Sequence, residues 1–285
     1  MSRRKTQRSP EGSKQISHSL THTMHTKSIL QFTRGLLAYL TIPPLTAAVC
    51  LGAIADVHWF RKSKVKVQVF PRTWGRLLCR IANIRVRVEG KEKLDPAKPY
   101  IFVGNHSSMA DIMSFSGYIS HDYRWIAKKE LFAIPIFGSG LRAVDFISIN
   151  RSRGREAVKS LNDAAQRIAD GASVILFPEG TRSSDGHLQP FKTGAIMLAL
   201  KAGVDVVPVG FNGTHQALPK GELLARGGDV VLRIGTPIPT KDFKAKDKQM
   251  LAGILHQKVA ELLNECHRPL PELENSPTVS AEVKG

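Results

Sequence analysis

The sequence predicts an α/β fold, with a mostly parallel mixed sheet flanked by helices and preceded by an N-terminal membrane-associated helical segment. From about residue 97, short apolar or β-branched runs alternate with stretches of helical periodicity, which is typical of a parallel sheet covered on both faces. Of the 285 residues, 42% are hydrophobic, so we expect one sizeable core rather than a disordered chain.

The first 28 residues predict a disordered basic tail. They are mostly Ser, Thr, Lys, Arg and His, so they bury too little apolar surface to offset the entropy of ordering. His18, His22 and His25 share the spacing of one helical face, but in such a tail we interpret them as incidental rather than as metal ligands.

Residues 29–91 predict a membrane-associated helical region. Residues 35–55 are uncharged and would measure about 30 Å as a helix, which is nominally enough to cross a bilayer. Pro43 and Pro44 remove two backbone donors and disfavour a straight span, so we expect a re-entrant or interfacial pair of helices in one leaflet. The alternative is an ordinary buried core helix.

The net charge of +17 is concentrated around this apolar run. Residues 1–34 carry +6 and residues 61–91 carry +9, whereas residues 92–285 carry only +3. Basic residues on both flanks favour a monotopic or re-entrant protein on the cytoplasmic face of the cell (inner) membrane, with the phospholipid leaflet as a partner. The competing interpretation is a nucleic-acid helix, but no nucleic-acid-binding motif follows, so we expect no nucleic-acid partner.

The expected α/β domain covers residues 92–268. Its predicted strands are the apolar runs at residues 100–103, 145–149, 173–177, 205–207 and 230–232. Helices are expected over residues 154–170, which Gly171 ends, and over residues 247–267. Residues 269–285 are rich in Pro, Glu and Ser and predict a flexible tail.

His106 and Asp111 follow the first of these strands, and the carboxyl ends of parallel strands are where α/β proteins place their sites. Ser107 or Ser108 can cap the next helix, and a His held before the cap can fold back onto the Asp. The carboxylate would fix the imidazole tautomer and stabilise the imidazolium that forms when the ring takes a proton. This predicts a general-base dyad, although a lone His near a strand end is more often structural.

The turn Phe177-Pro-Glu-Gly-Thr-Arg-Ser183 follows another buried strand. It offers backbone N–H groups, hydroxyls and a guanidinium, which are the groups that hold a phosphate. The alternative is a capped surface turn in which Glu179 pairs with Arg182.

Together, the two motifs resemble the first and third signature blocks of the 1-acyl-sn-glycerol-3-phosphate acyltransferases, which belong to the glycerophospholipid acyltransferase superfamily. Residues 146–151 (Phe-Ile-Ser-Ile-Asn-Arg) resemble the second block, and residues 207–210 (Val-Pro-Val-Gly) resemble the fourth. Asp145 stands where the second block commonly has Gly. The resemblance covers roughly residues 97–237.

The resemblance implies transfer of a fatty acyl group from acyl-CoA or acyl carrier protein to the sn-2 hydroxyl of 1-acyl-sn-glycerol-3-phosphate (lysophosphatidic acid), forming phosphatidic acid. His106 would be the base and Asp111 would orient it, with no covalent acyl-enzyme, no metal and no cofactor besides the thioester co-substrate. We expect the oxyanion donors to be backbone N–H groups near Gly180. The remaining residues that the resemblance implies in substrate binding are Lys128, Arg151, Glu179, Gly180, Thr181 and Arg182.

Two other functions stay open. An acyltransferase for another lyso-lipid acceptor would keep the dyad and lose the phosphate-binding residues. A non-enzymatic basic protein would bind anionic membranes or nucleic acid and turn over nothing. A serine-hydrolase route is excluded, because the chain has no GxSxG nucleophile elbow.

Overall fold

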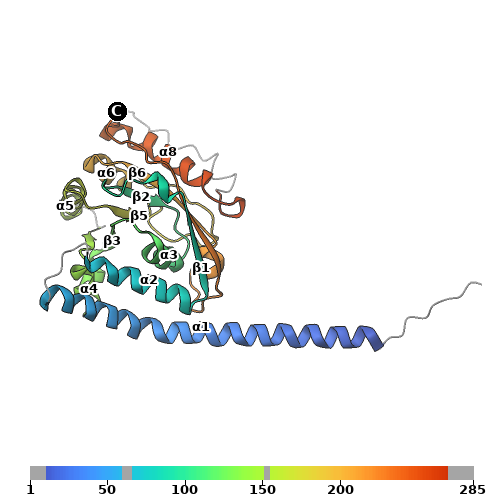
Figure 1. Ribbon diagram of the computed structural model, residues 1–285. Helices are drawn as coiled ribbons and strands as arrows, with labels where there is room; N and C mark the ends of the chain where they lie inside the picture. The colour runs from blue at the N-terminus through green and yellow to red at the C-terminus, as the bar shows by residue number, and fades with distance from the viewer. Residues whose placement is uncertain (1–10, 60–65, 151–154, 269–285) are drawn as a thin grey trace, which may run out of the picture.

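The computed structural model describes residues 11–59, 66–150 and 155–268, and one seven-stranded sheet forms its centre (Figure 1). The strands are β1 (Ile84–Glu89), β2 (Ile101–Gly104), β3 (Arg124–Lys128), β4 (Ile147–Ile149), β5 (Val174–Leu176), β6 (Val206–Asn212) and β7 (Gly228–Ile234). Their order across the sheet is β1-β7-β6-β2-β5-β3-β4. The five strands from β6 to β4 are parallel, β7 is antiparallel to β6, and β1 pairs in parallel with β7. The predicted mostly parallel mixed sheet is therefore confirmed.

Helices cover both faces of the sheet because successive side chains of a strand point to opposite faces. On β2, Phe102 packs into the cluster formed with α2 (Val69–Ile81) and α3 (Met109–Tyr118). Ile101 and Val103 pack into the cluster formed with α5 (Arg155–Ala169), α6 (Thr193–Ala202) and α8 (Lys248–Glu261). A strand buried on both faces is what its continuous apolar run predicted.

The remaining expected elements lie close to their predicted places. All five expected strands are present, and β6 and β7 extend beyond the runs that predicted them. Gly171, with φ +105°, follows the end of α5. The closing helix α8 stops at Glu261 and a short 3-10 turn follows at Glu265–His267, so the expected helix over residues 247–267 is interrupted. The tail predicted for residues 269–285 lies outside the described residues.

A single helix, α1 (Glu11–Trp59, 49 residues), is present where a disordered tail and a divided pair of helices were expected. Residues 11–28 are helical rather than disordered, and Pro43 and Pro44 lie inside the helix rather than dividing it. A proline inside a helix removes the hydrogen bond that its own N–H would donate and crowds the carbonyl group four residues earlier, and a helix can accommodate both by bending rather than ending. Residues 1–10 lie outside the described part of the chain.

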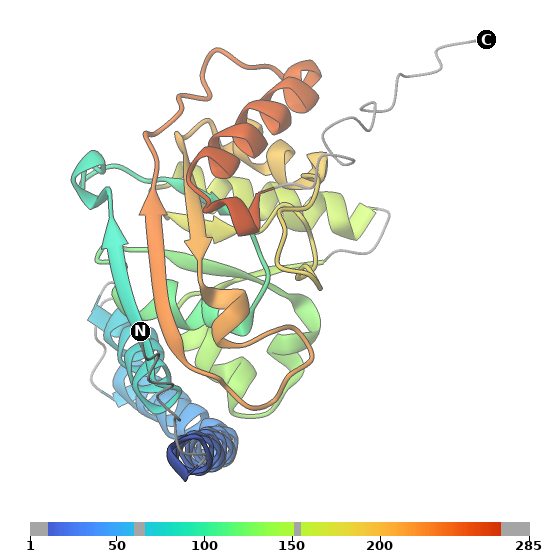
Figure 2. The ribbon, with the colours of Figure 1, turned by 90° about the vertical axis from the view of Figure 1, so that its right-hand side faces the viewer.

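The C-terminal part of α1 lies along the α/β domain and packs on it with one face, whereas its N-terminal part extends beyond the domain (Figures 1 and 2). A Cβ added at Gly35 would meet Leu224 at 2.8 Å, and Trp74 Nε1 donates to Thr46 Oγ1 at 3.0 Å. Within the described chain, Gly35–Trp59 is the one helical stretch long and apolar enough to cross a membrane, with a mean hydropathy of 1.8. The opposite face of α1 exposes large apolar side chains, among them Leu36, Leu37, Leu40, Leu51 and Trp59.

The sheet domain begins before residue 92, which corrects the expected boundary. β1 is an edge strand of the sheet, and α2 places Leu78 and Cys79 in the main core. Arg76, one of the basic residues of the 61–91 flank, donates from Nε to the carbonyl oxygen of Gly117 at 2.7 Å. This base therefore helps to satisfy the carbonyl groups at the C-terminal end of α3.

Candidate active site

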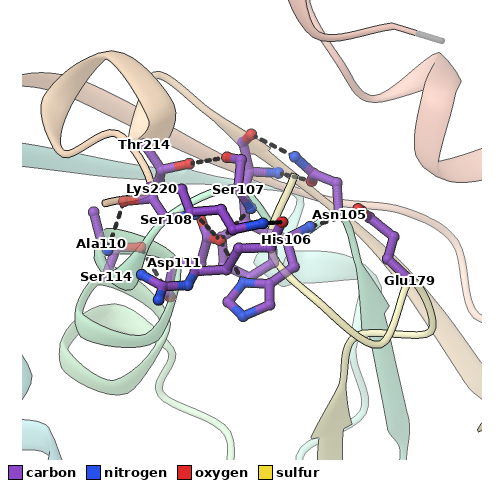
Figure 3. A network of polar contacts seen from close by, with 12 residues as sticks. Asn105, His106, Ser107, Ser108, Ala110, Asp111, Ser114, Glu179, Thr214 and Lys220 are labelled. Atoms are coloured by element: carbon purple, nitrogen blue, oxygen red, sulfur yellow. Dashed lines mark hydrogen bonds and ion pairs between the residues drawn. The ribbon is translucent and has the colours of Figure 1, made fainter. Parts of the chain in front are cut away.

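His106 and Asp111 are in contact beyond the carboxyl end of β2 (Figure 3). His106 Nδ1 lies 2.8 Å from Asp111 Oδ2. That oxygen also accepts the backbone N–H groups of Ser107 and Ser108, each at 2.9 Å, which disfavours a proton on it. His106 Nδ1 is therefore the donor, so Nε2 carries the lone pair that can take a proton.

The first turn of α3 explains the five-residue spacing of the pair. Ser108 is the N-cap and its Oγ accepts the N–H of Ala110 at 2.9 Å, while Asp111 completes the capping box from the third helical position. His106 precedes the cap, outside the helix, so its ring can turn back over the helix N-terminus onto Asp111. The contact that the sequence predicted is present.

Asn105 fixes the chain just before the dyad. Its Nδ2 donates to the carbonyl oxygen of Phe211 on β6 at 3.0 Å, and its Oδ1 accepts the N–H of Phe211 at 2.7 Å. These two hydrogen bonds resemble those of a further backbone pair between β2 and β6. The turn that carries His106 consequently has a fixed starting point on the sheet.

The imidazole of His106 is fixed by an aromatic ring as well as by Asp111. It stacks on Phe177 with ring centroids 3.9 Å apart and planes 6° apart. The His106 side chain is 14% exposed and that of Asp111 is 0% exposed. The hydrogen bond between them is therefore largely shielded from water, which strengthens it, while part of the ring remains accessible.

Glu179 lies beneath the site rather than at its surface. Its residue is 3% exposed, and its Oε1 accepts the backbone N–H of His106 at 2.8 Å. Burial raises the pKa of Glu179 to about 9, and the hydrogen bond from His106 opposes this effect only in part. At neutral pH the carboxyl group is thus uncharged and holds the backbone of His106. Within the described chain Glu179 forms no ion pair with Arg182, so the alternative of a capped surface turn is wrong, while a part of Glu179 in substrate binding stays a prediction.

The two sequence motifs are joined through the backbone, because the N–H of Ser183 donates to the carbonyl oxygen of His106 at 2.7 Å. Gly180 has φ +77°, a left-handed conformation that favours glycine. Its N–H donates to the carbonyl oxygen of Phe177 at 3.1 Å. This amide is therefore not free to bind an oxyanion, and the expectation that other backbone N–H groups near Gly180 do so stays a prediction.

Thr181 and Arg182 lie on the same turn, the first exposed and the second half-buried. Lys192 approaches the turn from the start of α6, with its Nζ 3.0 Å from the position that a Cβ on Gly180 would occupy. Arg182 and Lys192 place two cationic side chains beside a turn that is bonded directly to His106. Such a group of positive charges suits a phosphate.

Lys128 and Arg151 are less closely tied to the dyad. Lys128 is the last residue of β3, and its exposed side chain lies at the same edge of the sheet as His106. No hydrogen bond or ion pair joins it to the dyad within the described chain. Arg151 lies outside the described residues. Asp145 has φ +64°, which explains why a family block commonly has Gly at this position, and its Oδ1 pairs with Arg167 at 2.8 Å.

Phe177 and Lys220 contribute to the site in ways that the sequence did not reveal. The sequence predicts Phe177 only as part of a turn. Lys220 follows the short helix α7 (Thr214–Ala217), and its Nζ donates to the carbonyl oxygen of Arg182 at 2.6 Å (Figure 3). The partners are 38 residues apart, and no local pattern links them. Only the order of the strands brings them together.

The chain is similar to known acyltransferases over the region that contains His106 and Asp111. A family model described as "Acyltransferase" matches residues 85–212. The chain is 36% identical over 199 residues to a 1-acyl-sn-glycerol-3-phosphate acyltransferase of Chlamydomonas reinhardtii, covering 69% of this chain and 57% of that protein. It is 31% identical over 203 residues to the one of Limnanthes douglasii, covering 71% of this chain and 72% of that protein.

A solved structure is similar over most of its length. The crystal structure of the 1-acyl-sn-glycerophosphate acyltransferase PlsC from Thermotoga maritima matches with a TM-score of 0.68 and 28% sequence identity, covering 80% of this chain and 94% of that chain. Several curated relatives are longer: the matched region spans 63% of the protein from Cocos nucifera and 49% of the chloroplastic LPAT1 from Arabidopsis thaliana.

Proposed function

Because this chain belongs to the family of the 1-acyl-sn-glycerol-3-phosphate acyltransferases, we propose that it transfers a fatty acyl group from a thioester to the sn-2 hydroxyl of 1-acyl-sn-glycerol-3-phosphate. The donor is acyl-CoA or acyl carrier protein, and the product is phosphatidic acid. The observation that carries the proposal is the oriented His106–Asp111 pair, bonded through its backbone to a turn that bears cationic side chains.

In the proposed reaction, His106 Nε2 takes the proton of the acceptor hydroxyl as its oxygen attacks the thioester carbonyl carbon. Asp111 stabilises the imidazolium that forms. The tetrahedral intermediate then expels the thiolate, which takes the proton from the imidazolium and leaves as a thiol. The acyl group moves directly from sulfur to oxygen, so the proposal needs no acyl-enzyme, metal or further cofactor.

The phosphate of the acceptor binds, in this proposal, at the turn of Gly180, Thr181 and Arg182. The guanidinium of Arg182 can form two parallel hydrogen bonds to phosphate oxygens, and Lys192 adds positive charge beside Gly180 of the same turn. Lys220 fixes the backbone of Arg182 from behind. Lys128 is a further phosphate-binding residue that rests on the family resemblance.

The proposed location is one leaflet of the cytoplasmic face of a membrane. The apolar helix α1 supports association with a membrane, and the way it packs supports a position along the surface. Its contacts with the α/β domain extend from Gly35 to Ala53, about 27 Å of helix, so crossing the bilayer would require most of them to break. A lipid acceptor could then enter from the leaflet while the donor arrives from solution.

A turnover assay with purified full-length protein tests this function. Labelled lysophosphatidic acid is offered with acyl-CoA or with acyl carrier protein thioester, in parallel with lyso-lipids that carry choline, ethanolamine or glycerol headgroups. We expect labelled phosphatidic acid with at least one donor and poor use of the other acceptors. If another lyso-lipid is used in preference, the protein is an acyltransferase for that acceptor. No turnover with any pair of donor and acceptor would overturn the proposal.

A further inference from the structure

Residues 133–136 (Ala-Ile-Pro-Ile) form a run of four consecutive exposed apolar residues. Ile134 is 46% exposed and Ile136 is 44% exposed. The run connects the 3-10 helix Lys129–Ala133 to α4 (Phe137–Ala143). A run of consecutive exposed apolar residues is unusual on a soluble protein and is a feature of surfaces that bind a partner or a membrane.

Ile136, which is exposed, has an unfavourable backbone conformation. Its φ and ψ are +62° and −59°, and the N–H of Phe137 donates to the carbonyl oxygen of Pro135 at 2.6 Å. These features define a γ-turn of the positive-φ kind, which is rare and strained, and a β-branched residue at its centre is a clear outlier. Glycine would adopt this conformation without strain. Strain retained at an exposed apolar residue suggests that the side chain itself is needed.

The run is held rigidly. The N–H of Gly138 donates to the carbonyl oxygen of Ile134 at 2.8 Å, and the N–H of Gly140 donates to that of Ile136 at 2.8 Å. Arg142 Nη1 donates to the carbonyl oxygen preceding the run, on Phe132, at 2.7 Å. The two isoleucines therefore project from a fixed support and need not be ordered when they meet a partner.

The run also leads directly into α4, which packs on α1. α4 lies directly on α1, because a Cβ added at Gly140 would stand 2.6 Å from the Cβ of Cys50 (Figure 1). The next residue on α1, Leu51, is 52% exposed. Lys128 and Lys129, both exposed, come shortly before the run; Lys129 Nζ lies 3.6 Å from Glu156 Oε2, while Lys128 can reach anionic headgroups. An apolar projection beside exposed lysines and next to an apolar helix matches the layering of a leaflet.

We propose that residues 133–136 insert into the acyl-chain region of the leaflet on which α1 lies, and that they form a second membrane anchor at the edge of the sheet that carries the active site. The proposal rests on the membrane association proposed above. With α1 it gives the domain two separate points of attachment, which fix its orientation on the membrane.

A fluorescent label in the run tests insertion directly. Ile134→Cys, in a Cys266→Ser background that removes the exposed native thiol, carries an environment-sensitive fluorophore; Val158→Cys on α5 carries the same label as the matched control. Both proteins are mixed with vesicles of phosphatidylcholine and phosphatidylglycerol, and binding is measured by flotation. We expect the label at 134 to brighten and to be quenched by nitroxides on the lipid acyl chains, and the label at 158 to stay unchanged.

The outcomes separate the two proposals. Flotation without any change at residue 134 would overturn insertion and leave membrane association standing. Failure to float would overturn both. In unlabelled protein, Ile136→Gly should raise the melting temperature, because strain is relieved, and should weaken vesicle binding by about tenfold or more. A stabilised variant that binds vesicles as well as Val158→Ala would contradict the proposal.

Discussion

His106 is held through its backbone as well as through its ring. Its N–H donates to Glu179 and its carbonyl oxygen accepts the N–H of Ser183, while its ring contacts Asp111 and Phe177. Four contacts from two neighbouring strand ends leave the imidazole little freedom. Most of the order needed for proton transfer is therefore present before substrate binds.

The first prediction concerns Glu179 and pH. Since its pKa is about 9 in the folded protein and its ordinary value is 4.5, the folded state binds a proton between these pH values that the unfolded chain has released. Stability contributed by this proton is lost as the pH rises, so Glu179→Gln, which keeps an oxygen acceptor for His106, should stabilise the protein more at about pH 8 than at about pH 5. Thermal denaturation across this range measures the difference. A difference that does not change with pH would show that Glu179 is ionised in the folded state.

The second prediction concerns Arg182. Arg182→Ala should raise the KM for lysophosphatidic acid about tenfold to a hundredfold and leave the KM for the thioester nearly unchanged, because a charge-assisted contact to phosphate is lost. Arg182→Lys should recover only part of the loss, since an ammonium group cannot form the paired contact. Steady-state kinetics with each substrate varied in turn gives both constants. A rise in the donor KM alone would place Arg182 at the other substrate.

Sequence reasoning could reach the His106–Asp111 contact because a strand end, a cap and a short spacing are local signals. It could not reach the position of Glu179, since a charged residue in a turn predicts exposure and only the packed structure shows its burial. Lys220 was missed for a related reason, because its partner is distant in the chain. Residues that only the order of the strands brings together carry no signal in the local sequence.

At the scale of elements, the high positive charge before residue 92 did not indicate that part of this segment is a strand of the sheet. β1 alternates apolar and basic residues, with Ile84 buried and Arg85 exposed, which is the pattern of a half-buried edge strand. The many arginines in this segment instead favour the prediction of a membrane-associated region. β3 was missed because it begins with the charged Arg124, which is 5% exposed and pairs with Asp122 at 2.7 Å.

The packing of α2 on α3 gives a third prediction. A Cβ added at Gly75 on α2 would stand 2.5 Å from the backbone nitrogen of Gly117 on α3, so the two backbones touch. Gly75→Leu should lower the free energy of unfolding by about 1–3 kcal/mol or more through overpacking. Thr73→Leu, on the exposed side of α2, is the matched control. Equal stability of the two variants, measured by denaturant titration, would contradict close helix packing here.

At the scale of the whole molecule, α1 determines how the domain meets a membrane. The prolines do not divide the helix, so the expected break cannot be the reason for a one-leaflet position. The lateral contacts of α1 supply a better reason, since they join it to α2, to α4 and to the segment before β7. Length and hydropathy alone could not separate a spanning helix from one that lies along a domain.

The fourth prediction is that both ends of the apolar stretch stay on one side. His25→Cys and Lys62→Cys, each in a background without Cys266, are expressed in a bacterial host. A membrane-impermeant thiol reagent should reach neither site in intact spheroplasts and both after lysis. Labelling of one site from outside, with the other protected until lysis, would establish a membrane span.

The central claim is that His106 acts as the base that activates the acceptor hydroxyl, and one measurement tests it most directly. Single-turnover transfer of a labelled acyl group to lysophosphatidic acid is compared for the unaltered protein, His106→Ala and Asp111→Asn, with melting temperature and vesicle binding as controls for folding. We expect His106→Ala to lower the rate about 10²–10⁴-fold with both controls unchanged, and Asp111→Asn to be severely impaired. A folded His106→Ala protein that transfers the acyl group at nearly the unaltered rate would contradict the claim.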